Sequence, residues 1–222
     1  MSMVDRGMSV ELLRAEGLSC ERDDRMLFEN LNFQVNAGEV VQIEGPNGAG
    51  KTTLLKILGG LLQAWDGELY WRGEPMTQAR PDFLASLLYL GHRPGIKLIL
   101  SPWENLRTWC ALHQPSSDQE LFAALAQVGL KGYEHVPCDS LSAGQQRRVA
   151  LARLYLSKAD LWVLDEAFTA IDRRGVAQLE ALLAQKAAAG GAVILTTHHA
   201  LNLPGALRVI RLGGSLAEAF ES

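Results

Sequence analysis

The segment Gly45–Thr52, GPNGAGKT, decides the fold class of this 222-residue chain. It matches the pattern G-x-x-x-x-G-K-[ST], in which glycines let the backbone curl around a phosphate so that several N–H groups converge on its oxygens. The residues before it, VVQIEG, have the pattern of a buried strand, and KTTLLKILGG after it has that of a helix ended by glycines. The loop therefore stands between a strand and a helix, as a phosphate-binding loop requires.

The side chains of this loop predict a nucleotide triphosphate and Mg²⁺ as ligands. Lys51 would place a cation beside the β- and γ-phosphates, and the Thr52 hydroxyl would ligate the metal. An ordinary glycine-rich turn is the alternative, but the complete pattern in its required context argues against it. The residues that we expect to bind the nucleotide are Gly45, Pro46, Asn47, Gly48, Ala49, Gly50, Lys51, Thr52 and Thr53.

The segment Leu161–Glu166, LWVLDE, supplies a second half for this site. Its four apolar residues predict a central strand, and Asp165 at the carboxyl end would hold the Mg²⁺ shell. Glu166 would then accept a proton from the attacking water as the general base for hydrolysis. Taken alone, such an acidic pair is usually a solvated strand end, but a phosphate-binding loop in the same chain favours the catalytic interpretation.

Strand patterns alternate with helical patterns along the rest of the chain, which predicts an α/β fold with a mostly parallel sheet. Between about Pro81 and Lys158 the apolar residues instead recur at helical spacing. We therefore expect one domain over residues 1–222, with a helical subdomain inserted at approximately residues 92–157. The predicted strands lie in VELLRAEGLSC, LNFQVN, VVQIEG, GELYWRGEPM, ADLWVLDEA, GAVILTTHH and LRVIRLGG.

Composition excludes several classes of protein. The formal net charge of −4 argues against a general nucleic-acid surface, so we expect no nucleic-acid partner. The basic pairs Arg147–Arg148 and Arg173–Arg174 are interpreted as solvated helix faces or local ion-pair donors. The three cysteines lie far apart, without disulfide-framework or zinc-site spacing, and no apolar run reaches the roughly 18 residues of a membrane span. We expect a cytosolic protein that docks on membrane proteins.

A second anion site is predicted in DSLSAGQQRRVALARL, residues 139–154. Ser142 is a plausible N-cap of a helix, since Val149, Ala152 and Leu156 follow at helical spacing. The start of a helix attracts anions because its free N–H groups and the positive end of its dipole point the same way. One chain would therefore carry two phosphate sites.

These motifs together resemble the nucleotide-binding subunit of ATP-binding-cassette (ABC) transporters, whose signature Leu-Ser-Gly-Gly-Gln precedes the acidic strand. Here the signature is Leu141-Ser142-Ala143-Gly144-Gln145, with alanine for the first glycine. The resemblance implies a P-loop NTPase core with a parallel sheet, an antiparallel β subdomain and an inserted helical subdomain. It also implies ATPase activity with ATP and Mg²⁺.

The resemblance assigns roles to further residues. In the family, two copies bind head to tail, so Ser142, Gly144 and Gln145 of one copy would contact the γ-phosphate held by the other. Asp172, in FTAID, matches the acidic end of a loop that contacts the opposite subunit. His198, in ILTTHH, matches a catalytic histidine that touches the γ-phosphate and orients the water, whereas His199 beside it is interpreted as structural.

Three positions depart from the family pattern. Arg22 falls where an aromatic residue usually stacks on adenine, and Ala167 replaces the proline that follows the catalytic glutamate. Arg93 stands where the family has a glutamine that ligates Mg²⁺ and water, and an arginine cannot ligate a metal. The departures at Arg93 and Ala167 leave open an alternative in which the chain is a slow ATP-gated switch.

Within the family, the segments GHRPGIK and LSAGQQRRVALARL look like the ATPase subunit of the bacterial cytochrome c maturation system, often described as a haem exporter. This implies integral membrane transporter subunits as partners, at the cytoplasmic face of the bacterial inner membrane. The complex would use ATP for haem export or for release of a haem-loaded chaperone, and haem would concern this chain only indirectly. Transport of another substrate and action on ribosomes or DNA are the alternatives.

The segment Gly95–Trp109, GIKLILSPWENLRTW, concentrates apolar residues beside Arg93. Core packing would account for about half of them. The rest predict an exposed patch suited to a helix of a membrane partner.

Overall fold

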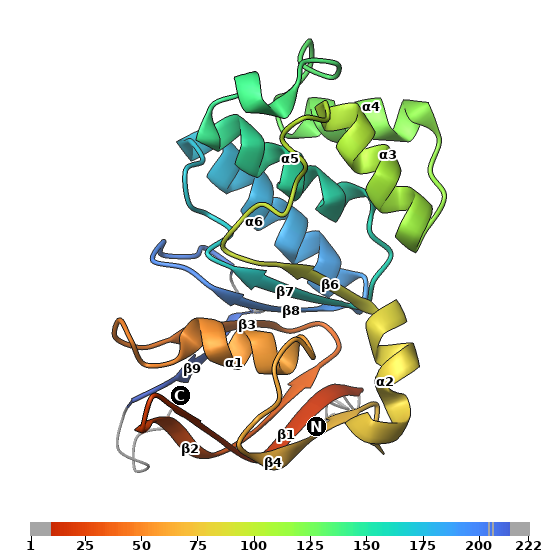
Figure 1. Ribbon diagram of the computed structural model, residues 1–222. Coiled ribbons are helices and arrows are strands. Elements are labelled where there is room, and N and C mark those ends of the chain that lie inside the picture. The colour runs from red at the N-terminus through yellow and green to blue at the C-terminus, as the bar shows by residue number, and fades with distance from the viewer. Residues whose placement is uncertain (1–9, 204, 206, 214–222) are drawn as a thin grey trace, which may run out of the picture.

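Helix α1 (Lys51–Leu58) lies between two β-sheets in the computed structural model, which describes residues 10–203, 205 and 207–213 (Figure 1). The antiparallel sheet has the strand order β2 (Arg25–Asn36), β1 (Glu11–Arg22), β4 (Asp66–Trp71) and β5 (Glu74–Pro75). The parallel sheet has the order β6 (Leu87–Leu90), β7 (Leu161–Asp165), β8 (Ala192–Thr196), β3 (Val40–Glu44) and β9 (Leu207–Arg211). The predicted α/β architecture, with a parallel core and an antiparallel subdomain, is confirmed.

The central parallel strands owe their position to their apolar residues. Every residue of β7 and β8 is buried, as expected for strands covered on both faces. Helix α1 adds Leu54, Leu55 and Leu58 to a core shared by both sheets. Because the strands are parallel, the ends of β3 and β7 meet at one edge of the sheet, where the phosphate loop and Asp165 stand.

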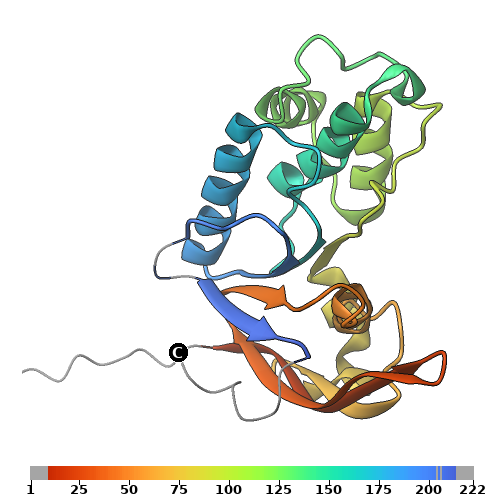
Figure 2. The same ribbon diagram turned by 90° about the vertical axis from the view of Figure 1, so that its left-hand side faces the viewer.

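A group of helices with its own core is inserted between β6 and β7. It consists of α3 (Pro102–His113), α4 (Asp118–Gln127), the short 3₁₀ helix η1 (Cys138–Ser140) and α5 (Ala143–Leu156). Serine capping boxes begin α3, α4 and α5, and they fix where each helix starts. The core of the group contains Leu106, Leu121, Leu125 and Val149. Figure 2 shows the group stacked beyond the parallel sheet, on the side away from α1.

Helix α6 (Arg173–Ala188) covers the face of the parallel sheet opposite α1 (Figure 1). Its residues Leu179, Leu183 and Ala187 pack with Val40 and Val193 of the sheet.

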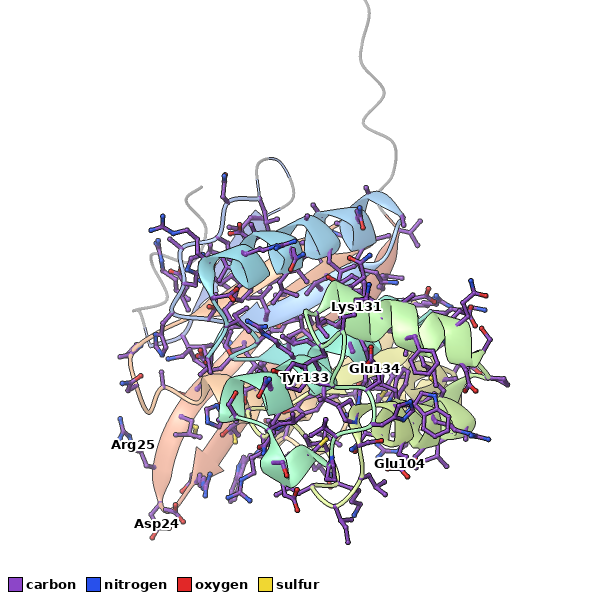
Figure 3. All side chains as sticks on the ribbon, turned by 90° about the horizontal axis from the view of Figure 1, so that it is seen from above. Asp24, Arg25, Glu104, Lys131, Tyr133 and Glu134 are labelled. Atoms are coloured by element: carbon purple, nitrogen blue, oxygen red, sulfur yellow. The ribbon has the colours of Figure 1, made fainter. Side chains whose placement is uncertain are left out.

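Seen from above in Figure 3, the tip of the β1–β2 hairpin lies apart from the inserted helices. Among the described residues, no helix is long and apolar enough to cross a bilayer.

Strand β6 was not expected, because the sequence predicts helical spacing from about Pro81 onward. In the structure, helix α2 (Met76–Ala85) ends at Ala85. The next residues form a strand at the edge of the parallel sheet, in which Leu87 pairs with Leu161 and Leu90 with Leu164. Two of the four residues of β6 are only partly buried, so the strand lacks the continuous apolar run of β7. The ends of the predicted domain, residues 1–9 and 214–222, lie outside the described residues.

Candidate active site

The phosphate loop joins β3 to α1 with a backbone that only glycines adopt easily. Gly45, Gly48 and Gly50 all have positive φ angles, of 150°, 83° and 90°. A Cβ atom on Gly45 would also lie 2.7 Å from the carbonyl oxygen of Leu212. Gly50 is the N-cap residue of α1 and no side chain caps the helix, so its first amide groups face the loop without a side-chain partner.

Lys51 holds its ammonium group across this loop. The Nζ atom donates hydrogen bonds to the carbonyl oxygens of Gly45, at 2.6 Å, and Pro46, at 3.1 Å. The cation therefore lies beside the amide groups that would bind an anion, which is the arrangement that a phosphate requires. The predicted nucleotide-binding residues from Gly45 to Thr53 are thus brought together in one loop and the first turn of α1.

Thr52 and Asp165 meet although they are far apart in the sequence. The Thr52 hydroxyl donates to Oδ1 of Asp165 at 3.2 Å, and the Thr196 hydroxyl donates to the same oxygen at 2.8 Å. Asp165 is only 1% exposed. The two predicted metal ligands are therefore close enough for one hydrated ion to contact both.

This pair fits Mg²⁺, which takes oxygen ligands and usually binds through one or two protein groups together with phosphate and water. Thr52 and Asp165 line a cavity of about 450 Å³ that Tyr89 also lines. Among the described residues the buried Tyr89 hydroxyl has no hydrogen-bond partner, so it is available to a water or a phosphate oxygen. Burial, and then the nearby Asp165 carboxylate, raise the pKa of Tyr89 to about 12, so it remains a neutral donor.

Glu166 and His198 form the predicted catalytic pair, with His198 Nε2 3.6 Å from Oε1 of Glu166. The Glu166 side chain is 19% exposed and that of His198 72% exposed. Glu166 has a φ of 52°, a strained region for a residue with a side chain. Its amide donates to the carbonyl and hydroxyl oxygens of Thr196, at 3.2 and 3.0 Å. The Glu166 carboxylate therefore lies directly after Asp165, beside an exposed imidazole.

His199 turns away from this pair. Its ring stacks on Phe168, and its Nε2 lies 3.7 Å from a carboxylate oxygen of Glu180. These contacts tie the loop after β8 to helix α6, in line with the structural role expected from the sequence.

The predicted second anion site is the start of α5. The Ser142 hydroxyl accepts a hydrogen bond from the Gln145 amide at 3.3 Å, and the Gln145 side chain accepts one from the Ser142 amide at 2.9 Å. A Cβ on Gly144 would lie 2.9 Å from the carbonyl oxygen of Ala170, so only glycine fits there without a shift. Helices α1 and α5 lie on opposite sides of the parallel sheet in Figures 1 and 2, so one chain does not bring these residues to its own phosphate loop.

Asp172 begins helix α6. One oxygen accepts a hydrogen bond from the Gly175 amide at 2.8 Å, and the other pairs with Arg148 at 2.7 Å. The hydrogen bond from Gly175, together with the charge of Arg148, lowers the pKa of Asp172. The interpretation of Arg148 as a local ion-pair donor is confirmed.

The same interpretation was wrong for Arg147, which is 4% exposed. Its guanidinium donates to four carbonyl oxygens, those of Gly91, His92, Asp165 and Glu166, at 2.8 to 3.2 Å. Sequence reasoning missed this residue because it treated two adjacent arginines as one surface feature. The helical spacing does contain the signal, since Arg147 falls on the face of the buried residues Ala150, Leu151 and Leu154.

Arg93, Arg22 and Ala167 occupy contrasting places. Arg93 is exposed and lines the cavity of Thr52 and Asp165, and within the described part of the chain it forms no salt bridge. Arg22 is exposed beside the β1–β2 turn, where it pairs with a neighbouring aspartate at 3.5 Å. Ala167 is fully buried against the core of α6 and the parallel sheet.

Comparison with known proteins places these features in a family. The family described as ABC transporter matches residues 28–169. A cytochrome c biogenesis ATP-binding export protein from Hahella chejuensis is 67% identical over 91% of this chain and 96% of its own length. One of the same name from Pseudomonas fluorescens is 54% identical over 93% and 98%.

The fold also has solved counterparts. A dimeric ATP-binding cassette in a post-hydrolysis state, bound to ADP and phosphate, has a TM-score of 0.79 and 21% sequence identity and covers 90% of this chain and 94% of its own. At this sequence identity the similarity shows the fold alone. Membership of the family rests on the sequence matches. The chain is thus an ATP-binding ATPase that belongs to the ABC transporter family, among the cytochrome c biogenesis ATP-binding export proteins.

Proposed function

We propose that this chain is the ATPase subunit of an ABC transporter for cytochrome c biogenesis. It would couple ATP binding and hydrolysis in a head-to-tail dimer to haem export or to release of a haem-loaded chaperone. The observation that carries the catalytic part is the convergence of Thr52, Asp165, Glu166 and His198 at one edge of the parallel sheet. The cargo rests on the names of the similar proteins, and an ABC transporter for another substrate is the alternative.

Different residues of the chain have different roles in ATP hydrolysis. The loop amides and Lys51 bind the β- and γ-phosphates, while Thr52 and the Asp165 shell would hold Mg²⁺. The metal, when bound, neutralises charge on the phosphate oxygens. Glu166 takes a proton as the water oxygen bonds to the γ-phosphorus and the bond to the β-phosphate oxygen breaks, and His198 orients this water.

A second copy of the chain would complete the site. Ser142 is exposed and Gly144 and Gln145 are half-exposed at the start of α5, a helix that lies on the other side of the parallel sheet from α1 (Figure 1). In a head-to-tail dimer they would face the γ-phosphate on the other copy, with the exposed Asp172 at the same interface. ATP would then bind between the two chains.

The membrane partner would dock beside the cavity of Thr52. Leu61, Leu98 and Ile99 are 61%, 49% and 83% exposed, and Leu61 lines this cavity. In the segment Gly95–Trp109, which contains Leu98 and Ile99, the side chains of Trp103 and Trp109 pack instead against the core of the inserted helices. We expect a helix of an integral membrane subunit to cover the exposed residues at the cytoplasmic face of the inner membrane.

Purification through this chain tests the proposal. A tagged chain, expressed with its chromosomal neighbours intact, should recover integral membrane subunits that raise ATP turnover, and the complex should carry haem or its chaperone. Ile99→Glu should lose these subunits and keep ATP binding. Met26→Glu, at another exposed apolar position, on β2, is the control and should lose nothing. Equal recovery with both variants would count against the docking surface, and a complex without haem or chaperone would favour another substrate.

Arg93 supports a second candidate, an ATP-gated switch with little hydrolysis. Its guanidinium lines the cavity beside Thr52 and Asp165 with no carboxylate partner among the described residues. A fixed cation there would compete with the metal and would supply no ligand to it. Turnover of the complete complex well below that of its Arg93→Gln variant would favour this candidate.

A further inference from the structure

The buried guanidinium of Arg147 joins two segments that carry the active site. Gly91 and His92 follow β6 and lead to Arg93, while Asp165 and Glu166 end β7. Strands β6 and β7 are neighbours in the parallel sheet, with Leu90 opposite Leu164. One side chain therefore spans the carboxyl ends of two adjacent strands.

The chemistry of the guanidinium makes this link rigid. Its donors lie in one plane in a fixed fork, so four carbonyl oxygens bonded to it have fixed positions relative to one another. Burial lowers the pKa of Arg147, and the nearby Asp165 and Glu166 carboxylates oppose that effect. An arginine guanidinium keeps its charge in proteins, and a buried cation that is bonded to carbonyl oxygens strongly resists their displacement.

Glu166 depends on this link for its orientation. Its backbone lies in the strained left-handed region, which persists only where the surroundings hold it on both sides. Thr196 holds the amide of Glu166, and Arg147 holds its carbonyl at 2.9 Å. Movement of Arg147 would therefore change the direction of the Glu166 carboxylate.

Arg147 also belongs to the helix that would contact the other copy's ATP. It lies about 7.5 Å along α5 from Ser142, and the helix between them is closed by the capping box. We propose that Arg147 is a positioning residue that couples the two ATP sites of the dimer. When α5 of one copy contacts the ATP held by the other copy, Arg147 would set the position of Glu166 in the copy to which α5 belongs. This inference rests on the proposed head-to-tail dimer, and it adds the route by which one site controls the other.

The matched comparison uses two arginines of the same helix. Arg147→Met and Arg147→Lys alter the link to both strand ends, and lysine keeps the charge without the fork. Arg153→Met removes a partly buried arginine that donates to the carbonyl of Gly95 at 2.8 Å and, among the described residues, forms no hydrogen bond to the strand ends. Each variant is assayed in the complex with its membrane subunits for ATP turnover against ATP concentration. ATP affinity of the isolated chain and thermal unfolding are measured in parallel.

We expect Arg147→Met to lower kcat roughly 10- to 100-fold and to reduce the Hill coefficient from about 2 toward 1. The ATP affinity of the isolated chain should stay within about 2-fold, because the phosphate loop is untouched. Arg147→Lys should fall between wild type and Arg147→Met, and it supplies the test if the methionine variant does not fold. Arg153→Met should lower the unfolding temperature and keep the wild-type Hill coefficient.

Two results would overturn the inference. A wild-type Hill coefficient in both Arg147 variants would show that the link does not couple the sites, and an equal loss in Arg153→Met would show that any destabilised α5 has this effect. Non-cooperative hydrolysis by the wild-type complex would instead contradict the dimer of the proposed function. Failure of the route and failure of the dimer are therefore distinguishable.

Discussion

Helices α1 and α5 both begin at a turn of small residues, but they differ in the state of their first amide groups. Gly50 begins α1, and no side chain caps the helix. Ser142 begins α5, where a capping box with Gln145 already satisfies two amides. The open start of α1 is suited to bind phosphate within its own chain, whereas the capped start of α5 is a preformed surface that can be presented to another chain.

The largest expected difference between the two helix starts is in ATP affinity. Lys51→Ala removes the cation that bonds to the loop carbonyls, and loss of a charged hydrogen bond of this kind should weaken ATP binding by the isolated chain about 10- to 100-fold. The matched change at the second start, Gln145→Ala, should leave that affinity within about 2-fold, because α5 lies on the other side of the sheet. Titration of each isolated variant with a fluorescent ATP analogue checks this, and equal losses would contradict the division of roles.

The open start of α1 was predictable because its signals are local. The pattern from Gly45 to Thr52 is contiguous, and the apolar runs of β3 and β7 are typical of buried parallel strands. The loop and the proposed metal ligands and general base therefore follow from short segments. The capping box of α5 is equally local, and Ser142 was expected as its N-cap.

What the sequence did not predict depends on contacts between distant segments. Arg147 bonds the carbonyls of Gly91 and Asp165, which no local pattern relates to it, so its charge suggested solvent. Strand β6 is short and half-buried, and the edge of the parallel sheet determines its conformation more than its own residues do. Both errors occur where contacts with distant segments, and not the local sequence pattern, determine the structure.

A smaller effect is expected at Arg93, beside the open start. Arg93→Gln removes a cation that has no salt-bridge partner among the described residues from the cavity of Thr52, and it offers an amide oxygen to the metal, so turnover at saturating Mg-ATP should rise by up to about 10-fold. Lys97→Gln, which removes an exposed positive charge from the same loop, is the control and should not change turnover. If Arg93→Gln is no faster than wild type, arginine is no handicap at this position.

The smallest effect concerns stability near the capped start, where Asp172 pairs with Arg148 of α5. Because its pKa is lowered in the folded chain, the Asp172 carboxylate contributes stability that is fully present above its ordinary value of 3.8. This stability is lost as the pH falls through the lower folded value. Asp172→Asn keeps the cap and loses the charge, so its deficit against wild type should be constant near neutral pH and should vanish in acid. Urea unfolding between neutral pH and pH 3 measures this, and a deficit independent of pH would exclude the charge as its source.

The central claim is that α5 of one copy completes the ATP site of the other, and the mass of the Glu166→Gln chain in Mg-ATP tests it most directly. Without the proposed general base this variant should keep ATP and be trapped as a dimer, measured by light scattering with the membrane subunits supplied if the isolated chain needs them. Adding Ser142→Arg should return it to a monomer that still binds ATP, since a bulky cation then replaces the hydroxyl that would face the γ-phosphate. Adding Gln119→Arg, at an exposed position of α4, should leave the dimer intact. An ATP-bound dimer that survives Ser142→Arg, or a Glu166→Gln chain that stays monomeric with its partners present, would contradict the account.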